Sequence, residues 1–504
     1  MTSTSTVAAR ARALWTFHGR GRVLHLTWFA FFLTFVVWFD FAPFAKTIGA
    51  QLHLTEAEIK TVGICNVALT VPARIFIGMA LDRWGPRRVF SAILGFAVVP
   101  NTIFAVSSSF NSLVLSRLAL SVVGAGFVVG IRMVAEWFPP RELGAAEGIY
   151  GGWGNFGSAA AAFSLPLVAG LIGGADGWRW AIGGVGVLAA AYGVVYFRTV
   201  ADTPDGVSFA RPRRQGALEV THRSAVWGLA ALTVPINGVL VLIGWRIWRE
   251  EVVSDATFVV VLAGTAGLLI VQELALWRVN TAARANAYRP RDRYPVRTVA
   301  VLCLAYFATF GSELAVVTML PAFFADTWSL GPAAAGVAAS AFAFMNLVAR
   351  PGGGLLSDLL GSRRGTLMVL CIGLVAGYGL LAALGPAWPW GLAVVACMVC
   401  SLFVQAGEGA VYAIVPLVKK RVSGQISGLV GAYGNVGAVV FLTLGLFVPA
   451  RVFFLAIAGT ALVATVACRF LIEPEHSFAV DLVSEEAEEA EADRVELAAL
   501  PAGS

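Results

Sequence analysis

The sequence has few charged residues and is especially poor in lysine. Only 13% of its 504 residues are charged, against about 25% in a soluble globular domain. Lysine occurs only at positions 46, 60, 419 and 420, so nearly all basic residues are arginine. Hydrophobic residues make up 58% of the chain, and the mean hydropathy is +0.78. This composition excludes a soluble multidomain protein and predicts an all-α polytopic membrane protein that has the lipid bilayer as its surroundings.

The sequence also lacks the residue clusters that carry enzyme chemistry. It has no cluster of metal ligands, no nucleophile–base set and no phosphate loop, so we expect no enzymatic activity, metal, cofactor or nucleic-acid partner. The segment GGWGNFG (151–157) contains G-x-G-x-x-G, but no strand precedes it and no βαβ unit surrounds it, which excludes dinucleotide binding. The six cysteines lie in apolar runs, and we expect free buried thiols, including the C-x-x-C pair Cys397 and Cys400.

Apolar runs of about 20 residues, long enough to span a bilayer, recur along the chain. Six predicted spans lie in each half, at 24–45, 59–81, 88–107, 112–137, 148–172 and 179–198, and at 298–324, 333–356, 365–384, 390–417, 425–448 and 451–472. Two further runs, 225–245 and 257–277, fit a transmembrane hairpin, and the alternative is that one or both lie along the membrane interface. We therefore predict an N-terminal six-helix half (1–200), a central linker with the hairpin (201–297), a C-terminal six-helix half (298–472) and an acidic tail (473–504).

Basic residues are distributed unevenly between alternate loops. They gather in the loops after the second, sixth, eighth and tenth of the twelve principal spans, whereas loops 107–111 and 173–177 contain none. Because cytoplasmic loops carry an excess of arginine and lysine, we expect both termini to be cytoplasmic, in a multi-pass protein of the cytoplasmic (inner) membrane. We also expect a monomer.

The second half of the chain repeats the first. GMALDRWGPRR (78–88) matches GLLSDLLGSRR (354–364) at an offset of 276 residues, and GGWGNFG (151–157) matches GAYGNVG (431–437) at an offset of 280. Such a repeat predicts two halves related by pseudo-twofold symmetry, with a binding site at the bilayer midplane between them. We expect the charged residues of the first pair to lock and release helix ends: Asp82, Arg83, Arg87, Arg88 and Asp358.

Two arginines occupy equivalent places inside apolar runs of the two halves. Arg74 and Arg350 each stand four residues before a glycine and eight before an aspartate. A guanidinium inside a membrane helix is costly and usually serves a substrate or ion path. Two such groups at equivalent places predict one shared site, and an anion fits a site with two forks of hydrogen-bond donors.

These features resemble the nitrate/nitrite porter family of the major facilitator superfamily, and most of all its cyanobacterial-type nitrate permeases. The segments that carry the resemblance are VPARIFIGMALDRWGPRR, GAGFVVGIRMVAEWFPPRELGAAEGIYGGWGNFG, FGSELAVVTMLPAFF, ARPGGGLLSD and QAGEGAVYAIVPLVKKRVSGQISGLVGAYGNVGAVV. The resemblance implies a secondary transporter that imports nitrate, or nitrite, by alternating access. It also implies substrate contacts from Arg74, Arg350, Asn155, Asn435, Phe127, Tyr306 and Phe310. The alternatives are interhelical hydrogen bonding for the asparagines and core packing for the aromatic residues.

Two acidic residues, Glu313 and Glu408, also lie within apolar runs. An acid at the position of Glu313 resembles the proton-coupled branch of the family, which implies that both residues take part in proton symport. The alternatives are a static ion pair with an arginine for each acid, nitrate/nitrite exchange instead of symport, and a nitrate sensor that does not transport. We further expect Arg132 to pair with Glu136 one turn away, and Asp40 to reach water at the outer end of the first helix.

Overall fold

The computed structural model describes residues 14–249, 251–289 and 292–480, and within these ranges it contains helices and no strand. The helices of the N-terminal half are α2 (Gly19–Phe39), α3 (Ala45–Gln51), α4 (Glu56–Ala68), α5 (Thr70–Trp84), α6 (Pro86–Val106), α7 (Phe110–Leu120), α8 (Phe127–Trp137), α9 (Pro140–Ile172) and α10 (Gly177–Thr199). The short 3-10 helices η1 (Ala42–Phe44) and η2 (Ser121–Gly126) complete it.

The rest of the described chain forms a central helix pair and a second half. The central helices are α11 (Arg223–Arg249), α12 (Asp255–Val279) and α13 (Thr281–Arg284). The C-terminal half contains α14 (Val296–Trp328), α15 (Pro332–Phe344), α16 (Asn346–Leu359), α17 (Arg363–Ala383), α18 (Trp390–Tyr412), η4 (Val415–Leu417), η5 (Lys420–Val422), α19 (Ser423–Leu444) and α20 (Ala450–Cys468). The predicted acidic segment at 484–496 lies outside the described residues.

Thirteen helical stretches of the described chain are long and apolar enough to cross a membrane. The predicted span 333–356 is not among them. It is divided at Met345 into α15 and α16, which have 13 and 14 residues. The equivalent break in the first half falls at Leu69, between α4 and α5. Pro72 contributes to that break, because it cannot donate a hydrogen bond to the carbonyl of Ala68. Each break precedes its buried arginine by five residues, so the two arginines occupy equivalent backbone positions relative to the breaks.

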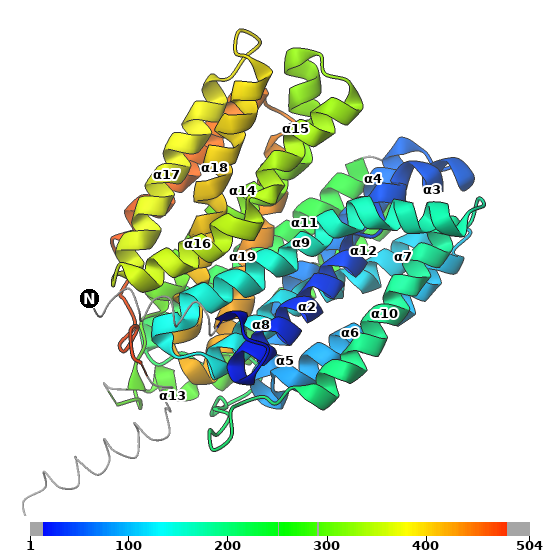
Figure 1. Ribbon diagram of the computed structural model, residues 1–504. Helices are drawn as coiled ribbons and strands as arrows, with labels where there is room; N and C mark the ends of the chain where they lie inside the picture. The colour runs from blue at the N-terminus through cyan, green and yellow to red at the C-terminus, as the bar shows by residue number, and fades with distance from the viewer. Residues whose placement is uncertain (1–13, 250, 290–291, 481–504) are drawn as a thin grey trace, which may run out of the picture.

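The helices form two lobes that meet at one end and diverge at the other (Figure 1). The N-terminal lobe is blue to cyan and the C-terminal lobe is yellow-green to orange, and the lobes are farthest apart near α3, α4 and α15. The outward surface is rich in exposed apolar side chains, such as Leu171, Val337 and Val348. A soluble surface does not expose so many, whereas a lipid-facing surface requires them. The predicted fold, two six-helix halves with a central two-helix insertion, is thus confirmed.

The central helices pack along the bundle. Tyr433 on α19 donates a hydrogen bond to the carbonyl of Leu232 on α11 (3.0 Å), and Asn237 on α11 donates one to Gln272 on α12 (2.8 Å). More than half of the residues of α12 are exposed, and most of the exposed ones are apolar. This arrangement favours a hairpin that spans the membrane over one that lies along its interface.

Candidate substrate site between the two halves

The two predicted arginines meet over a single aromatic ring. Arg74 on α5 and Arg350 on α16 are both buried, with 0% and 1% of their surfaces exposed. The Cζ atom of Arg74 lies 5.5 Å from the ring centroid of Phe127, and the Cζ atom of Arg350 lies 5.2 Å from the same centroid. The cationic groups of the two halves are therefore close neighbours at the centre of the bundle, as the repeat predicted.

The partners of the two arginines differ. Arg350 donates to a carboxylate oxygen of Glu408 and to the hydroxyl of Tyr306 (3.2 Å). Arg74 donates from Nη1 to the carbonyl of Gly431 (2.5 Å), but its Nε and Nη2 have no hydrogen-bond partner in the described chain. Because buried donors are almost always satisfied, these two nitrogens indicate a place for a ligand that accepts hydrogen bonds.

Aromatic rings enclose the space beside the arginines. The rings of Phe127 and Tyr306 are parallel at 6.3 Å between centroids, and Tyr306 stacks on Phe310 at 5.1 Å. Tyr412 packs edge-on against both Phe127 (4.8 Å) and Tyr306 (4.9 Å). The three predicted aromatic residues therefore lie together at the arginines, and α18 adds Tyr412.

The glycine-rich helices let each half reach the arginine of the other. A Cβ atom on Gly151 of α9 would lie 2.5 Å from Nε of Arg350, and one on Gly431 of α19 would lie 3.1 Å from Nη1 of Arg74. Gly148 and Gly428 pack in the same crossed way, against the backbone carbonyls of Arg350 and Arg74. The repeated glycines are explained by this close approach between helices, as is common in membrane bundles.

The two signature asparagines lie one turn beyond these glycines but form no hydrogen bond with either arginine within the described residues. Asn155 and Asn435 are 7% and 3% exposed, and Oδ1 of Asn155 and Nδ2 of Asn435 have no hydrogen-bond partner within the described ranges. Their unpaired amide atoms fit a ligand role better than interhelical hydrogen bonding, and the role stays a prediction.

The two predicted acids lie in one polar cluster of the C-terminal half. Glu408 on α18 forms an ion pair with Arg350. Glu313 on α14 accepts hydrogen bonds from Asn346 on α16 and Gln405 on α18 (3.4 Å). Glu313 interacts electrostatically with both Glu408 and Arg350. The ion pair is the alternative that the sequence left open for Glu408, whereas Glu313 bonds to two neutral amides and lies against the Glu408 carboxyl.

Two aspartates tie the halves together at one end of the bundle. Asp82, at the end of α5, accepts hydrogen bonds from the backbone N–H groups of Gly424 and Gln425 at the start of α19 (both 2.9 Å). Its equivalent Asp358 accepts from Gly144 (3.1 Å) and Ala145 (2.7 Å) at the start of α9. Carboxylates at helix N-termini are well placed, because they meet unpaired N–H groups and the positive end of the helix dipole.

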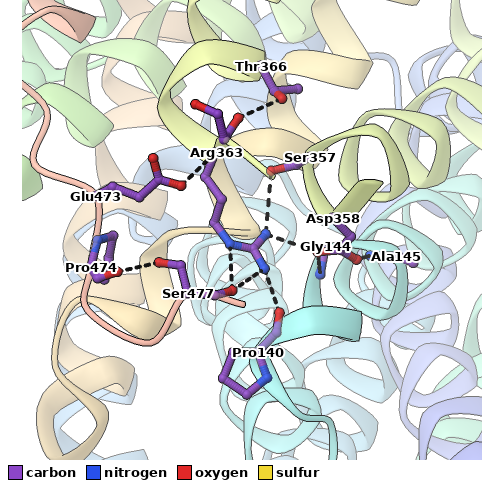
Figure 2. A network of polar contacts seen from close by, with 11 residues as sticks. Pro140, Gly144, Ala145, Ser357, Asp358, Arg363, Thr366, Glu473, Pro474 and Ser477 are labelled. Carbon is purple, nitrogen blue, oxygen red and sulfur yellow. Dashed lines mark hydrogen bonds and ion pairs between the residues drawn. The ribbon is translucent and has the colours of Figure 1, made fainter. Parts of the chain in front are cut away.

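Figure 2 shows how the second of these contacts is reinforced. Arg363 forms an ion pair with Asp358 (3.0 Å) and donates to the carbonyls of Pro140 and Ser477. Its backbone N–H donates to Glu473 (2.7 Å), so the segment after α20 joins the same network. Arg363 is the counterpart of Arg87 in the repeat, but we had not predicted a role for it.

In the N-terminal half, the arginines near the end of α5 have different partners from Arg363. The acid Asp82 faces Arg132, at 3.9 Å, instead of Arg87. Arg87 donates from its backbone N–H to Asp202 (2.7 Å) and its side chain lies over Phe197. Burial raises the pKa of the Asp202 carboxyl, and this hydrogen bond opposes the shift. Arg83 and Arg88 are exposed. The contacts of Asp82 and Asp358 with the opposite half thus form two locks. The two aspartates bind equivalent backbone N–H groups, whereas the arginines that face them are not equivalent.

Two further expectations from the sequence concern charged pairs. Arg132 pairs with Glu136 at 2.7 Å, as predicted. The prediction that Asp40 reaches water is wrong, because it is fully buried and paired with Arg117 (2.7 Å). Asn101 also donates to Asp40 (2.9 Å). From sequence, a residue close to the end of a span is expected to be solvent-exposed, but here α6 and α7 supply Asn101 and Arg117 to cover it.

Among the residues the structure describes, no group of three or more histidine, cysteine, aspartate or glutamate side chains could hold a metal ion, and all six cysteines are free and buried.

The fold and the buried charged site between the two halves define a polytopic membrane transporter. A sequence profile of the Major Facilitator Superfamily matches residues 27–282 and 302–497.

Similar proteins narrow the assignment. The chain is 47% identical to the nitrate/nitrite transporter NrtP of Picosynechococcus sp., over 92% of this chain and 95% of that one. It is 30% identical to the high affinity nitrate transporter 2.5 of Arabidopsis thaliana, over 83% and 72%. The superfamily transporter FucP in its outward conformation has the same fold, with a TM-score of 0.62 at 11% identity, over 89% and 98%. The chain therefore belongs to the Major Facilitator Superfamily and, within it, to the nitrate/nitrite porter family of cyanobacterial type.

Proposed function

We propose that this protein imports nitrate, and also nitrite, across the cytoplasmic membrane by alternating access with proton symport. The observation that carries the proposal is the convergence of Arg74 and Arg350 on the Phe127 ring, with two nitrogens of Arg74 unpaired. The names of the relatives, nitrate/nitrite transporter and high affinity nitrate transporter, point to the same anion.

The chemistry of the site suits nitrate. Nitrate is a flat, delocalised monoanion that has no proton to donate, so its site needs donors alone. Guanidinium groups supply planar forks of such donors. The aromatic rings of Phe127, Tyr306, Phe310 and Tyr412 suit the faces of a flat and weakly hydrated anion. The amides of Asn155 and Asn435 would complete the donor set from the two signature helices.

The locks at Asp82 and Asp358 supply the gate. They join the halves at the end of the bundle where the charged loops after α5 and α16 lie, which we assign to the cytoplasm together with both chain termini. Breaking these four backbone contacts would release α19 and α9 from the opposite halves. The site would then open toward the cytoplasm while the diverging ends of the lobes close.

Two arguments support proton coupling: the energetic cost of importing an anion against the membrane potential, and the presence of Glu313 in the buried site. A membrane potential of 100 mV, inside negative, opposes the inward movement of an anion by about 2.3 kcal/mol. Uphill import therefore needs more than one co-moving proton for each nitrate, or an outgoing anion. In our proposal Glu408 is the counter-ion of Arg350. Glu313 then binds a proton, because a second negative charge beside Glu408 would be costly in a buried site.

Uptake of labelled nitrate into proteoliposomes, with the pH gradient and the voltage imposed separately, tests the proposal. We expect accumulation that is driven by an inward proton gradient and that needs no internal anion. Uptake that requires internal nitrite and ignores the pH gradient would instead select nitrate/nitrite exchange. Nitrate binding without any flux would identify a sensor, and no response to nitrate at all would refute the proposal.

The crossed packing of glycine on arginine gives a specific prediction. Gly151→Ala would place a methyl group 2.5 Å from Nε of Arg350, closer than two non-bonded atoms can lie. Because the ion pair with Glu408 holds the guanidinium, we expect the KM for nitrate uptake to rise by about tenfold, as one disturbed charged hydrogen bond would produce. Gly170→Ala on the same helix is the control, since a Cβ there meets nothing within 4 Å. Equal KM values for both variants would contradict this account.

A further inference from the structure

Glu147 is a buried acid that the proposed function does not yet use. It lies on α9, one turn before Gly151, and is 1% exposed. Neither of its carboxylate oxygens has a hydrogen-bond partner among the residues described. An ionised carboxylate buried without a partner is strongly disfavoured, so this side chain is either neutral or balanced by a cation.

The surroundings of Glu147 connect it to the substrate site. The guanidinium of Arg350, from the opposite half, acts on it electrostatically. Arg350 from α16 is paired with Glu408 from α18. Glu147 and Arg350 both act electrostatically on Tyr150 of α9, as does Tyr196 from α10. The rings of Phe31 from α2 and Phe127 from α8 lie against Tyr150 at 5.1 and 6.0 Å between centroids. Asp358, farther along α16, is already paired with Arg363.

A count of charges shows what this placement implies. Arg74 and Arg350 supply two positive charges in the closed site. Glu408, bonded to Arg350, and a bound monoanion supply two negative charges. An ionised Glu147 would add a negative charge with no cation to balance it, so it must carry a proton while the anion is enclosed. When the anion leaves and water enters, the carboxyl can ionise, because an exposed glutamate is ionised near neutral pH.

The repeat shows that Glu147 is not required by the packing. The equivalent position in the C-terminal half, at the offset of 280 residues, is the neutral Ser427, which lies among the same glycines. Gly144 and Gly148 flank Glu147 as Gly424 and Gly428 flank Ser427. One half thus carries an acid where the same close-packed helix in the other half does without one.

From these observations we infer that Glu147 is a proton-binding site of the transport cycle, in addition to Glu313. The inference rests on the proposed function, that is, on nitrate import coupled to protons. Glu147 takes up a proton with the anion. It releases this proton when the anion departs. No other group is transferred, so each cycle moves one proton through Glu147.

The test is the number of protons carried per nitrate, measured with purified full-length protein in proteoliposomes. A nitrate gradient is opposed by a pH gradient while potassium and valinomycin hold the voltage at zero, and the pH gradient at which net flux stops gives the number of protons moved per nitrate. We expect Glu147→Gln to carry one proton fewer per nitrate than the wild type while it retains nitrate counterflow. Glu142→Gln is the matched control on α9, because Glu142 already pairs with Arg20 at 2.7 Å outside the site, and its stoichiometry should be unchanged.

Two results would overturn the inference while leaving nitrate transport by the wild type in place. An unchanged stoichiometry in Glu147→Gln would mean that this carboxyl moves no proton. Loss of counterflow in the folded variant would mean that Glu147 holds Arg350 in position instead. A wild type that moves no nitrate at all would refute the proposed function itself, which separates the two failures.

Discussion

Arg74→Lys and Arg350→Lys are each expected to abolish nitrate uptake while the protein still folds. A lysine ammonium keeps the charge but cannot form the planar fork of donors that an oxyanion accepts. Each charged hydrogen bond is worth about 1.5–3 kcal/mol, so loss of one fork should weaken nitrate binding by about 100-fold or more. Initial rates of labelled nitrate uptake, together with the thermal stability of the purified protein, provide the measurement.

The control for these variants is Arg451→Lys, at an exposed arginine at the start of α20, which should transport normally. Near-normal uptake by either of the two site variants would remove the central assignment. Loss of thermal stability along with uptake would indicate that the arginine is structural, because each one also bonds to the opposite or adjacent helix.

Glu313→Gln should lose one coupled proton, and with it most of the proton-driven accumulation, while nitrate counterflow persists. Glutamine can still accept hydrogen bonds from Asn346 and Gln405, so the local packing survives, but it cannot exchange a proton. We therefore expect the ratio of internal to external nitrate under an inward proton gradient to fall to the value that one remaining proton per nitrate, carried through Glu147, can sustain. The ratio is measured at steady state in proteoliposomes.

Glu56→Gln is the comparison for this experiment, because Glu56 is exposed at the start of α4 and should leave accumulation unchanged. If Glu313→Gln abolished counterflow as well, the acid would be structural and proton coupling would have to be assigned elsewhere. If it accumulated nitrate normally, Glu313 would carry no transported proton.

Much of the site can be predicted from the sequence, because many of its residues occur at matched positions in both copies of the internal repeat. Arg74 and Arg350, and the glycines around 151 and 431, stand in matched segments, so symmetry alone implies that they meet at the pseudo-twofold axis. The structure adds a crossed arrangement that a one-dimensional repeat does not reveal, in which Gly151 packs on Arg350 and Gly431 on Arg74.

Residues without a counterpart in the repeat are harder to predict. Tyr412 was visible as one more aromatic residue in an apolar run, but its position against Phe127 and Tyr306 depends on how α18 crosses α8 and α14. Glu147 could have been noticed as an acid inside the signature segment, where its counterpart is Ser427. The burial of Asp40 could not be predicted, because it depends on Arg117 and Asn101 from two other helices.

The asymmetry between the halves has a consequence for mechanism. The arginines, glycines and gate aspartates are matched, whereas Glu313 and Glu408 lie in the C-terminal half and Glu147 lies in the N-terminal half. Symmetric elements suit a site that must open alternately to both sides, and they hold the anion in both states. In our proposal, the unmatched acids give the cycle its dependence on protons.

The most direct test of the central claim is a high-resolution structure of the protein loaded with nitrate. Our account predicts one nitrate beside the Phe127 ring, with its oxygens about 2.7–3.2 Å from guanidinium nitrogens of both Arg74 and Arg350. A nitrate that contacts only one of these arginines, or that binds away from the interface between the two halves, would contradict it.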